Sequence, residues 1–114
     1  MTTLDQTQIL WQGEDKSVDV NLVNAAGAPY GSTTGLTFTY RITNAADDRS
    51  AIVNKTSGSG LTNGTSKVTI TYDKADTKDV PAGLYYHEMR VKDGSNEEDV
   101  VFIGLFDLRA SNTL

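Results

Sequence analysis

The segment LTFTYRI, residues 36–42, decides the fold class, because every second residue in it is apolar. Successive side chains of an extended chain point to opposite faces, so this alternation predicts a β-strand with one apolar and one polar face. Threonine and arginine occupy the polar positions, which suits contact with water. The four side chains that share the apolar face are Leu36, Phe38, Tyr40 and Ile42.

The same alternation returns on both sides of this segment. In VTITY, residues 68–72, and in Ser17–Val23 the apolar residues again lie on one side. Two later segments are longer and more continuously apolar, which is typical of central strands whose outer face is also partly covered. The expected strands, of which the first and the fourth have the weaker patterns, are Gln8–Trp11, Ser17–Val23, Leu36–Ile42, Ala51–Asn54, Val68–Tyr72, Leu84–Lys92 and Asp99–Leu108.

Turn-forming residues separate these strands. Asn63-Gly64 is typical of a tight hairpin, and Asp93-Gly94 indicates that the last two strands form another. About seven short strands with no helical pattern between them predict an all-β, immunoglobulin-like antiparallel β-sandwich, with a small barrel as the alternative. The length of 114 residues fits a single domain, residues 1–114, with a short N-terminal arm of about residues 1–12.

The composition excludes several classes of function. The chain has no cysteine, so it has no disulfide framework and no thiolate chemistry. It has 10 Lys and Arg against 15 Asp and Glu, and a net charge of −5 opposes binding to polyphosphates, so we expect no nucleic-acid partner. Acidic residues precede any Lys or Arg at the N-terminus, and no long apolar stretch follows, so we expect neither a signal peptide nor a membrane span.

Few residues suggest catalysis or a metal site. His87 is the only histidine, and the alternation of its strand places it on the same face as Tyr85 and Met89, which indicates a structural, inward-facing side chain. A zinc site or a Ser/His/Asp triad would need partners of which the sequence gives no hint. Loop carboxylates leave calcium as a less favoured alternative. We therefore expect no enzyme, no catalytic residue, no cofactor and no metal ligand.

Five residues are candidates for contact with another protein. Ile9, Leu10 and Trp11 form an apolar patch near the N-terminus. Trp11 either caps the core beside an edge strand or docks on a neighbour, since tryptophan is frequent at the centres of interfaces. Tyr30 follows a proline in a turn, and Tyr86 points away from the face that Tyr85 occupies, so both tyrosines are further contact candidates.

The region between residues 72 and 86 has a pattern of its own. It contains a strand, a crossing loop and a new strand that starts with Gly83-Leu84-Tyr85, a corner that sandwich domains often lock with a tyrosine hydroxyl. The turn AGAP (26–29), the strand TFTYRI, the block KVTITYDKADTKDVPAGLYYHEMRV and the ending GLFDL follow one another in an order that resembles the immunoglobulin-like N-terminal domain of phage upper-baseplate proteins and related tail modules. This resemblance covers Gly13 to Leu108.

The resemblance implies a component of the virion that attaches other proteins to the particle and catalyses nothing. It implies a bacteriophage tail or baseplate protein that assembles in the host cytoplasm, has other virion proteins as partners and contacts no membrane. In that family the domain usually continues into a further one, whereas this sequence ends at Leu114, so a head decoration protein that stabilises the capsid is the alternative. A carbohydrate- or receptor-binding module is a third. The polar composition leads us to expect a monomer in solution that is oligomeric only in the particle.

Overall fold

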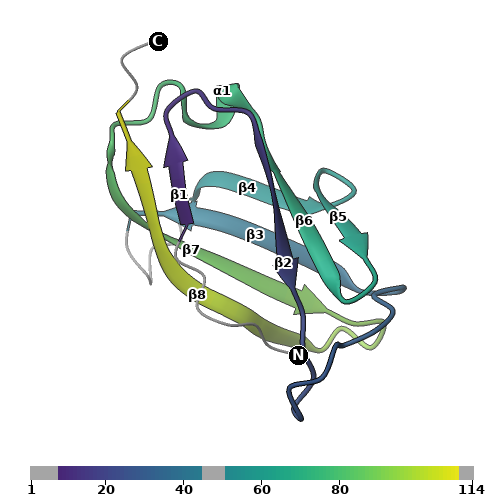
Figure 1. The fold of residues 1–114 in the computed structure, drawn as a ribbon. Coiled ribbons are helices and arrows are strands. Elements are labelled where there is room, and N and C mark those ends of the chain that lie inside the picture. The colour runs from purple at the N-terminus through teal and green to yellow at the C-terminus, as the bar shows by residue number, and fades with distance from the viewer. Residues whose placement is uncertain (1–7, 45–50, 111–114) are drawn as a thin grey trace.

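Strands make up almost all of the structure (Figure 1), a computed structural model that describes residues 8–44 and 51–110. Of the expected N-terminal arm, residues 1–7 lie outside the described part. The described chain contains one short helix, and no helix in it is long and apolar enough to cross a membrane. The elements are β1 (Gln8–Trp11), β2 (Lys16–Asn21), β3 (Thr37–Thr43), β4 (Ala51–Ser57), β5 (Gly60–Gly64), β6 (Lys67–Tyr72), α1 (Lys74–Thr77), β7 (Gly83–Lys92) and β8 (Glu98–Arg109).

The eight strands form one mixed, curled sheet in the order β1-β8-β7-β3-β4-β5-β6-β2. The chain turns a corner between β4 and β5, where Thr56 pairs with Gly60 and Ser57 with Leu61 in parallel register. Beyond this corner, β5, β6 and β2 form a second layer, which crosses in front of β3 and β7 in Figure 1. The inner faces of the two layers share one hydrophobic core.

The all-β prediction is confirmed, but the count and the pairing of the strands differ from it. Eight strands are present, and both β1 with β8 and β4 with β5 pair in parallel, so the sheet is not purely antiparallel. Sequence reasoning missed β5 because its residues, GLTNG, include two glycines and only one apolar side chain, Leu61. Asn63 and Gly64 belong to β5, and the hairpin turn lies after them, at Thr65-Ser66.

The second predicted hairpin is confirmed between β7 and β8. The side-chain oxygen Oδ1 of Asp93 accepts hydrogen bonds from the backbone N–H groups of Ser95 (2.8 Å) and Glu97 (3.1 Å). Asn96 has a positive φ of 63° in this turn, a conformation that asparagine tolerates better than most residues. The strands that this turn joins pair along their whole length, from Lys92 with Glu98 to Gly83 with Leu108.

The core follows from the alternation that the sequence shows. In β3, Phe38, Tyr40 and Ile42 are all buried, and the same holds for Val68, Ile70 and Tyr72 of β6. Leu36 precedes β3 and is only partly buried. The remaining buried apolar residues come from both layers: Leu10, Val20, Leu22, Val53, Leu61, Tyr85, Met89, Val91, Val101, Phe102, Phe106 and Leu108.

The connection from β6 to β7 contains the short helix α1, which the sequence did not indicate. The helix starts where the backbone N–H of Asp73 donates to the Asp76 carboxylate (2.8 Å). Thr77 is buried, and its hydroxyl accepts a hydrogen bond from the backbone N–H of Gly13 (3.0 Å). Gln12 donates from its side chain to the carbonyl oxygen of Val80 (2.7 Å). These bonds fix the connection to the turn after β1.

A tyrosine locks the corner at which β7 begins, as its sequence pattern predicts. The hydroxyl of Tyr85 donates to the carbonyl oxygen of Pro81, four residues upstream, at 2.5 Å. The Tyr85 side chain is buried, whereas Pro81 is exposed, so this bond lies at the border of the core.

We predict that Tyr85→Phe lowers the free energy of unfolding by about 1–2 kcal/mol, because it removes one hydrogen bond and leaves a carbonyl oxygen without its donor. Urea unfolding followed by circular dichroism measures this change. Tyr86→Phe, at the neighbouring exposed position, is the control and changes stability by less than about 0.5 kcal/mol. Equal losses in the two variants would contradict the role assigned to the Tyr85 hydroxyl.

Candidate functional site

Exposed apolar side chains gather on the outer face of β1, β8 and β7. Leu105 of β8 lies directly opposite Tyr86 of β7, and Ile103 lies one step further along the same face. On the other side of β8, Ile9 of β1 is in register with Asp107, and Trp11 with Arg109. Because side chains of neighbouring strands in register stand side by side, these residues form one surface.

Seven of the eight large hydrophobic residues that are exposed in the described chain belong to this surface. Large exposed apolar side chains are usually scattered, so their gathering on one face needs an explanation. Leu84 is 68% exposed and Ile103 is 54% exposed, although both belong to strands with a fully formed core side. We call this surface the β8 face; its apolar members are Ile9, Trp11, Leu84, Tyr86, Val100, Ile103 and Leu105.

A β-bulge decides which residues of β8 reach the face. The register shifts between Met89 and Arg90 of β7: Met89 pairs with Phe102, but Arg90 pairs with Val100. Val101 and Phe102 are therefore consecutive residues that are both buried. The extra residue lets β8 place Val100 and, beyond the bulge, Ile103 on the outer face of the same strand.

Two ion pairs within the chain lie on the β8 face. Nε of Arg90 lies 2.7 Å from the Glu88 carboxylate, and this hydrogen bond raises the pKa of the guanidinium. Nε of Arg109 lies 3.2 Å from the Asp107 carboxylate, and its guanidinium carbon lies 5.9 Å from the centre of the Trp11 ring. The two pairs add no net charge to the face, in a chain with a net charge of −5.

The five predicted contact residues lie in different parts of the structure. Ile9, Trp11 and Tyr86 all lie on the β8 face and are 40%, 48% and 37% exposed. The Trp11 side chain thus lies outside the core. Leu10 is fully buried, because it alternates with its neighbours and points inward opposite Leu108. Tyr30 is exposed but lies elsewhere, beside an acidic pocket.

Sequence reasoning missed four of the five aliphatic members of the face, which are Leu84, Val100, Ile103 and Leu105. They belong to the long apolar segments whose pattern predicts central strands with partly covered outer faces. The signal was present in the run VVFIGL, residues 100–105, because a strand of alternating direction cannot bury all of these side chains on one side. This run does not indicate which of its side chains are exposed.

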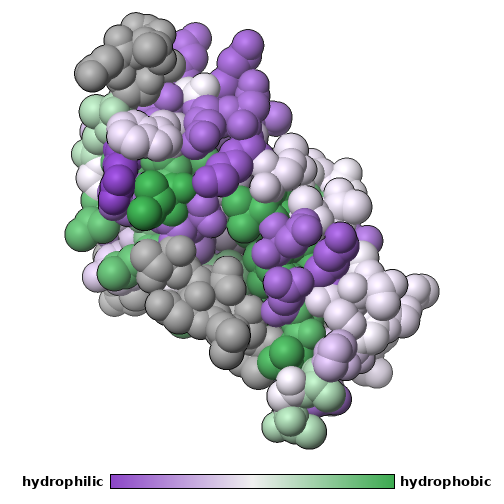
Figure 2. Space-filling model, viewed as in Figure 1, coloured by the Kyte–Doolittle hydropathy of each residue, from purple (hydrophilic) through white to green (hydrophobic). Residues whose placement is uncertain are grey.

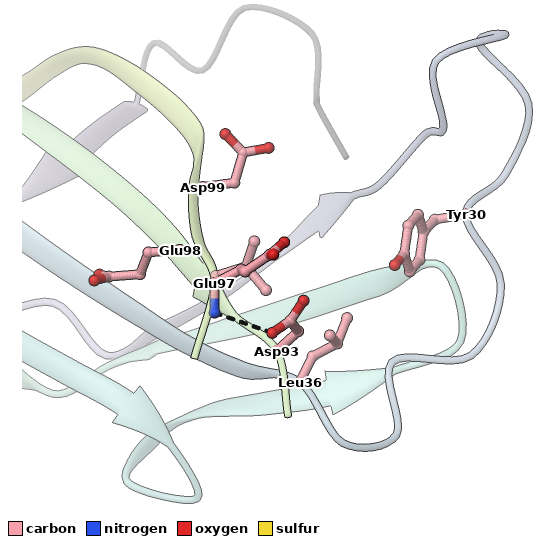
Figure 3. A pocket seen from close by; sticks show the side chains of 7 residues that line it. Tyr30, Leu36, Asp93, Glu97, Glu98 and Asp99 are labelled. Carbon is pink, nitrogen blue, oxygen red and sulfur yellow. Dashed lines mark hydrogen bonds between the residues drawn. The ribbon is translucent and has the colours of Figure 1, made fainter. Parts of the chain in front are cut away.

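The acidic pocket lies at the end of the β7–β8 hairpin and has a volume of about 310 Å³. Tyr30 and Leu36 face Asp93 and Glu97 in it, whereas Glu98 and Asp99 point in other directions (Figure 3). One carboxylate is already used, since Asp93 accepts the hydrogen bond from the Glu97 backbone. No group of three or more Asp, Glu, His or Cys side chains in the described residues is arranged to hold a metal ion.

A chain of buried polar groups crosses the core. The hydroxyl of Tyr40 lies 2.7 Å from the hydroxyl of Tyr72 and 2.9 Å from Nδ1 of His87. The His87 ring packs against Phe102 and Phe106, with ring centres 4.9 and 5.7 Å away. His87 is 2% exposed, which confirms the inward direction predicted for it. The chain links the two layers of the sheet, because Tyr40 belongs to β3 and Tyr72 to β6.

Hydrophilic residues predominate near the α1 end of the molecule in Figure 2, and hydrophobic residues reach the surface in separate patches further along it.

The buried Lys55 pairs with Asp76 of α1, Nζ to Oδ2, at 2.8 Å. This ion pair connects β4 to α1, the helix in the connection from β6 to β7. In register, Lys55 lies opposite Tyr40, next to the hydroxyl chain.

No family model matches this chain, and neither does any curated protein.

We predict that the protein loses stability as the pH rises above about 10. Burial raises the pKa of Tyr40 and of Tyr72, so both stay protonated in the folded state where the unfolded chain begins to lose these protons. The stabilisation is complete below the ordinary tyrosine pKa and falls above it. Tyrosinate absorbance during an alkaline titration, recorded with circular dichroism, should therefore rise in two stages, the second together with unfolding.

The control for this prediction is Tyr72→Phe, which removes one of the two buried phenols. In the wild type, two of the five tyrosines ionise in the second stage of the titration, and in the variant only one does. The absorbance change of the second stage should therefore be about half as large. If every tyrosine ionised before the loss of β-structure, the assignment of Tyr40 and Tyr72 to a protected environment would be wrong.

Proposed function

We propose that this protein is a non-enzymatic attachment module that binds another protein through the β8 face. The observation that carries the proposal is that seven of the eight exposed large hydrophobic residues in the described part of the chain lie on this one face. A gathering of large exposed apolar side chains is typical of a protein–protein interaction site, and on this face the Glu88–Arg90 and Asp107–Arg109 pairs lie among them. Trp11 and Tyr86 provide aromatic anchors, which often contribute much of the binding energy.

The arrangement of the strands supports an immunoglobulin-like sandwich as the finer fold. The corner between β4 and β5 divides the sheet into one layer of β1, β8, β7, β3 and β4 and another of β5, β6 and β2. The Tyr85 hydroxyl bond to Pro81 supports the same interpretation, because such a bond is a hallmark of this class of sandwich. In this proposal a rigid two-layer scaffold presents one outer face to a partner.

The resemblance of the sequence to phage upper-baseplate domains suggests where such a module works. We infer a structural protein of a bacteriophage virion that assembles in the host cytoplasm and joins the tail or baseplate, with other virion proteins as partners. Neither nucleic acid nor a membrane has a part in this proposal. A head decoration protein is the second candidate, since it would use the same kind of face.

A carbohydrate- or receptor-binding module is less well supported. Glycan sites combine aromatic rings with polar groups that fix the orientation of the sugar. Five of the seven apolar residues of the β8 face are aliphatic, and its two aromatic residues belong to β1 and β7, which are separated by β8. This composition suits another protein surface better than a sugar ring.

We predict that particles of the encoding phage contain this polypeptide in a small copy number, in multiples of three or six, because tails and baseplates have that symmetry. Quantitative mass spectrometry of purified particles, with the major capsid protein as the internal standard, gives the number. Hundreds of copies would move the protein to the head. Complete absence from particles would contradict the virion proposal.

We also predict that Tyr86→Arg lowers incorporation into particles at least about 10-fold, because a guanidinium would lie at the centre of an apolar contact. Tyr30→Arg is a matched control: the same residue, equally exposed at 37%, is replaced by the same residue away from the face. The measurement is the copy number after complementation of a phage that lacks the gene. Equal incorporation of both variants would exclude the β8 face as the attachment surface.

A further inference from the structure

Asn63 and Gly64 form the only Asn-Gly pair in the sequence, and they lie in β5, beside the corner where the sheet turns between β4 and β5. We propose that Asn63 is a site of spontaneous deamidation that the fold keeps unreactive. Its side-chain amide reacts only when this corner opens, and the product no longer fits the corner. This inference goes beyond the proposed function and does not depend on the β8 face.

The reaction needs only the chain itself and water. The backbone nitrogen of Gly64 attacks the side-chain carbonyl carbon of Asn63, and the new C–N bond closes a five-membered succinimide ring. The side-chain nitrogen leaves as ammonia, which takes up the proton of the Gly64 N–H group. Water then opens the ring at either of its carbonyl groups and gives aspartate or isoaspartate. Glycine favours the attack, because it has no Cβ to obstruct the approach to its nitrogen.

Water has access to the pair in the folded protein. A polar hollow of about 240 Å³ is lined by Ser32, Thr33 and Thr34 as well as by Asn63 and Gly64. Both residues of the pair are only partly buried. Exclusion of water therefore does not protect Asn63, and its protection has to come from geometry.

Hydrogen bonds to three residues hold the Asn63 side chain. Its Nδ2 donates to the carbonyl oxygen of Leu36 (2.9 Å) and, in a longer and weaker contact, to that of Thr33 (3.4 Å). Its Oδ1 accepts a hydrogen bond from the hydroxyl of Ser57 (2.8 Å). Because both ends of the amide are bound, its carbonyl carbon turns toward the Gly64 nitrogen only after these bonds break.

The backbone of the pair is held as well. Asn63 lies opposite Val68 and Gly64 opposite Lys67 in the antiparallel pairing of β5 with β6, and the carbonyl oxygen of Gly64 accepts a hydrogen bond from the buried Thr33 hydroxyl (2.8 Å). In an extended strand the side chain projects to the side, away from the nitrogen of the next residue. Ring closure thus requires a backbone rotation at Asn63 that breaks this pairing. The rate of the reaction therefore follows how often the corner opens.

The product cannot restore these contacts. A carboxylate has no hydrogen to donate, so at position 63 it would direct its negative charge at the carbonyl oxygens of Leu36 and Thr33. Isoaspartate also adds one methylene group to the backbone and so disturbs the pairing with β6. The intact amide connects β5 to the start of β3 and to Ser57 at the end of β4, which belong to the other layer. Deamidation therefore weakens a connection between the two layers.

The rates of deamidation in the folded and the unfolded chain test the proposal. The purified protein is kept in buffer and in urea at the same pH and temperature, and peptide mapping by mass spectrometry follows the conversion of Asn63. We expect conversion in buffer to be at least about 10-fold slower than in urea, because the open form of a paired strand is a minor population. Equal rates would overturn the protection by the fold, and an Asn63 that stays intact in urea would overturn the site itself.

Gly64→Ala separates the chemistry from the fold. The φ of Gly64 lies outside the left-handed region, and the added methyl group would meet Cγ of Lys67 at 2.9 Å, in a half-exposed, flexible side chain that can move. The variant should therefore fold, whereas its methyl group obstructs the attacking nitrogen and makes conversion of Asn63 in urea slower than in the wild type. Conversion in urea at the wild-type rate would exclude the Gly64 nitrogen as the nucleophile.

Asn63→Asp introduces the aspartate product directly. We expect it to raise the equilibrium constant of unfolding at least about 10-fold, measured by urea unfolding with circular dichroism, because a buried donor is lost and a charge is added. Asn24→Asp is the matched control: the Asn24 Oδ1 accepts hydrogen bonds from the backbone N–H groups of Ala26 (2.9 Å) and Ala28 (3.1 Å), and a carboxylate keeps both. Its unfolding constant should stay within about threefold of the wild type.

The two Asn→Asp variants also give the result that would contradict the proposal. If Asn63→Asp is as stable as Asn24→Asp, the product fits the corner and the inference is wrong. If Asn63→Asp does not fold while Asn24→Asp does, the product is incompatible with the corner, and the rates measured on the wild type still test the protection independently.

Discussion

The long pairing between β7 and β8 determines which of their side chains enter the core and which form the outer surface. Its ladder extends from Gly83 with Leu108 to Lys92 with Glu98, and the side chains of both strands alternate between the core and the outer face. The bulge opposite Met89 adds one residue to β8 and so sets which side chains lie on each face. A register slip of one residue would expose Phe102 and Phe106 and bury charged residues, so core packing and the outer surface are fixed by the same hydrogen bonds.

Specific polar contacts, and no covalent link, hold the two layers of the sheet in place. The hydroxyl chain from Tyr72 through Tyr40 to His87 crosses between them inside the core, and the Lys55–Asp76 ion pair ties β4 to α1. Every buried side-chain nitrogen and oxygen in the described residues has a hydrogen-bond partner. Buried polar groups are costly when one partner is lost, so such a network favours one arrangement of the layers over others.

The sequence predicted the parts of this structure that follow from period-two alternation. Strands such as β3 and β6 could be located because polar and apolar residues alternate strictly in them. The strand β5 could not, because pairing with β4 and β6 overrides the low strand propensity of Gly60 and Asn63. Helix α1 depends on hydrogen bonds to a distant turn. Of the predicted contact residues, Ile9, Trp11 and Tyr86 lie on the β8 face, whereas alternation turns Leu10 inward. No local pattern in the sequence reveals the bulge that lets Val100 and Ile103 share the outer face.

The internal pairing of charges on the β8 face has a kinetic consequence. Oppositely charged surfaces accelerate association by guiding partners together over long distances, and salt weakens that guidance. A face whose carboxylates are already neutralised by Arg90 and Arg109 gives no such guidance. Encounters through it therefore proceed at the slower pace of unassisted diffusion, about 10⁵–10⁶ M⁻¹s⁻¹. The speed of assembly through this face then depends chiefly on how much protein the cell makes.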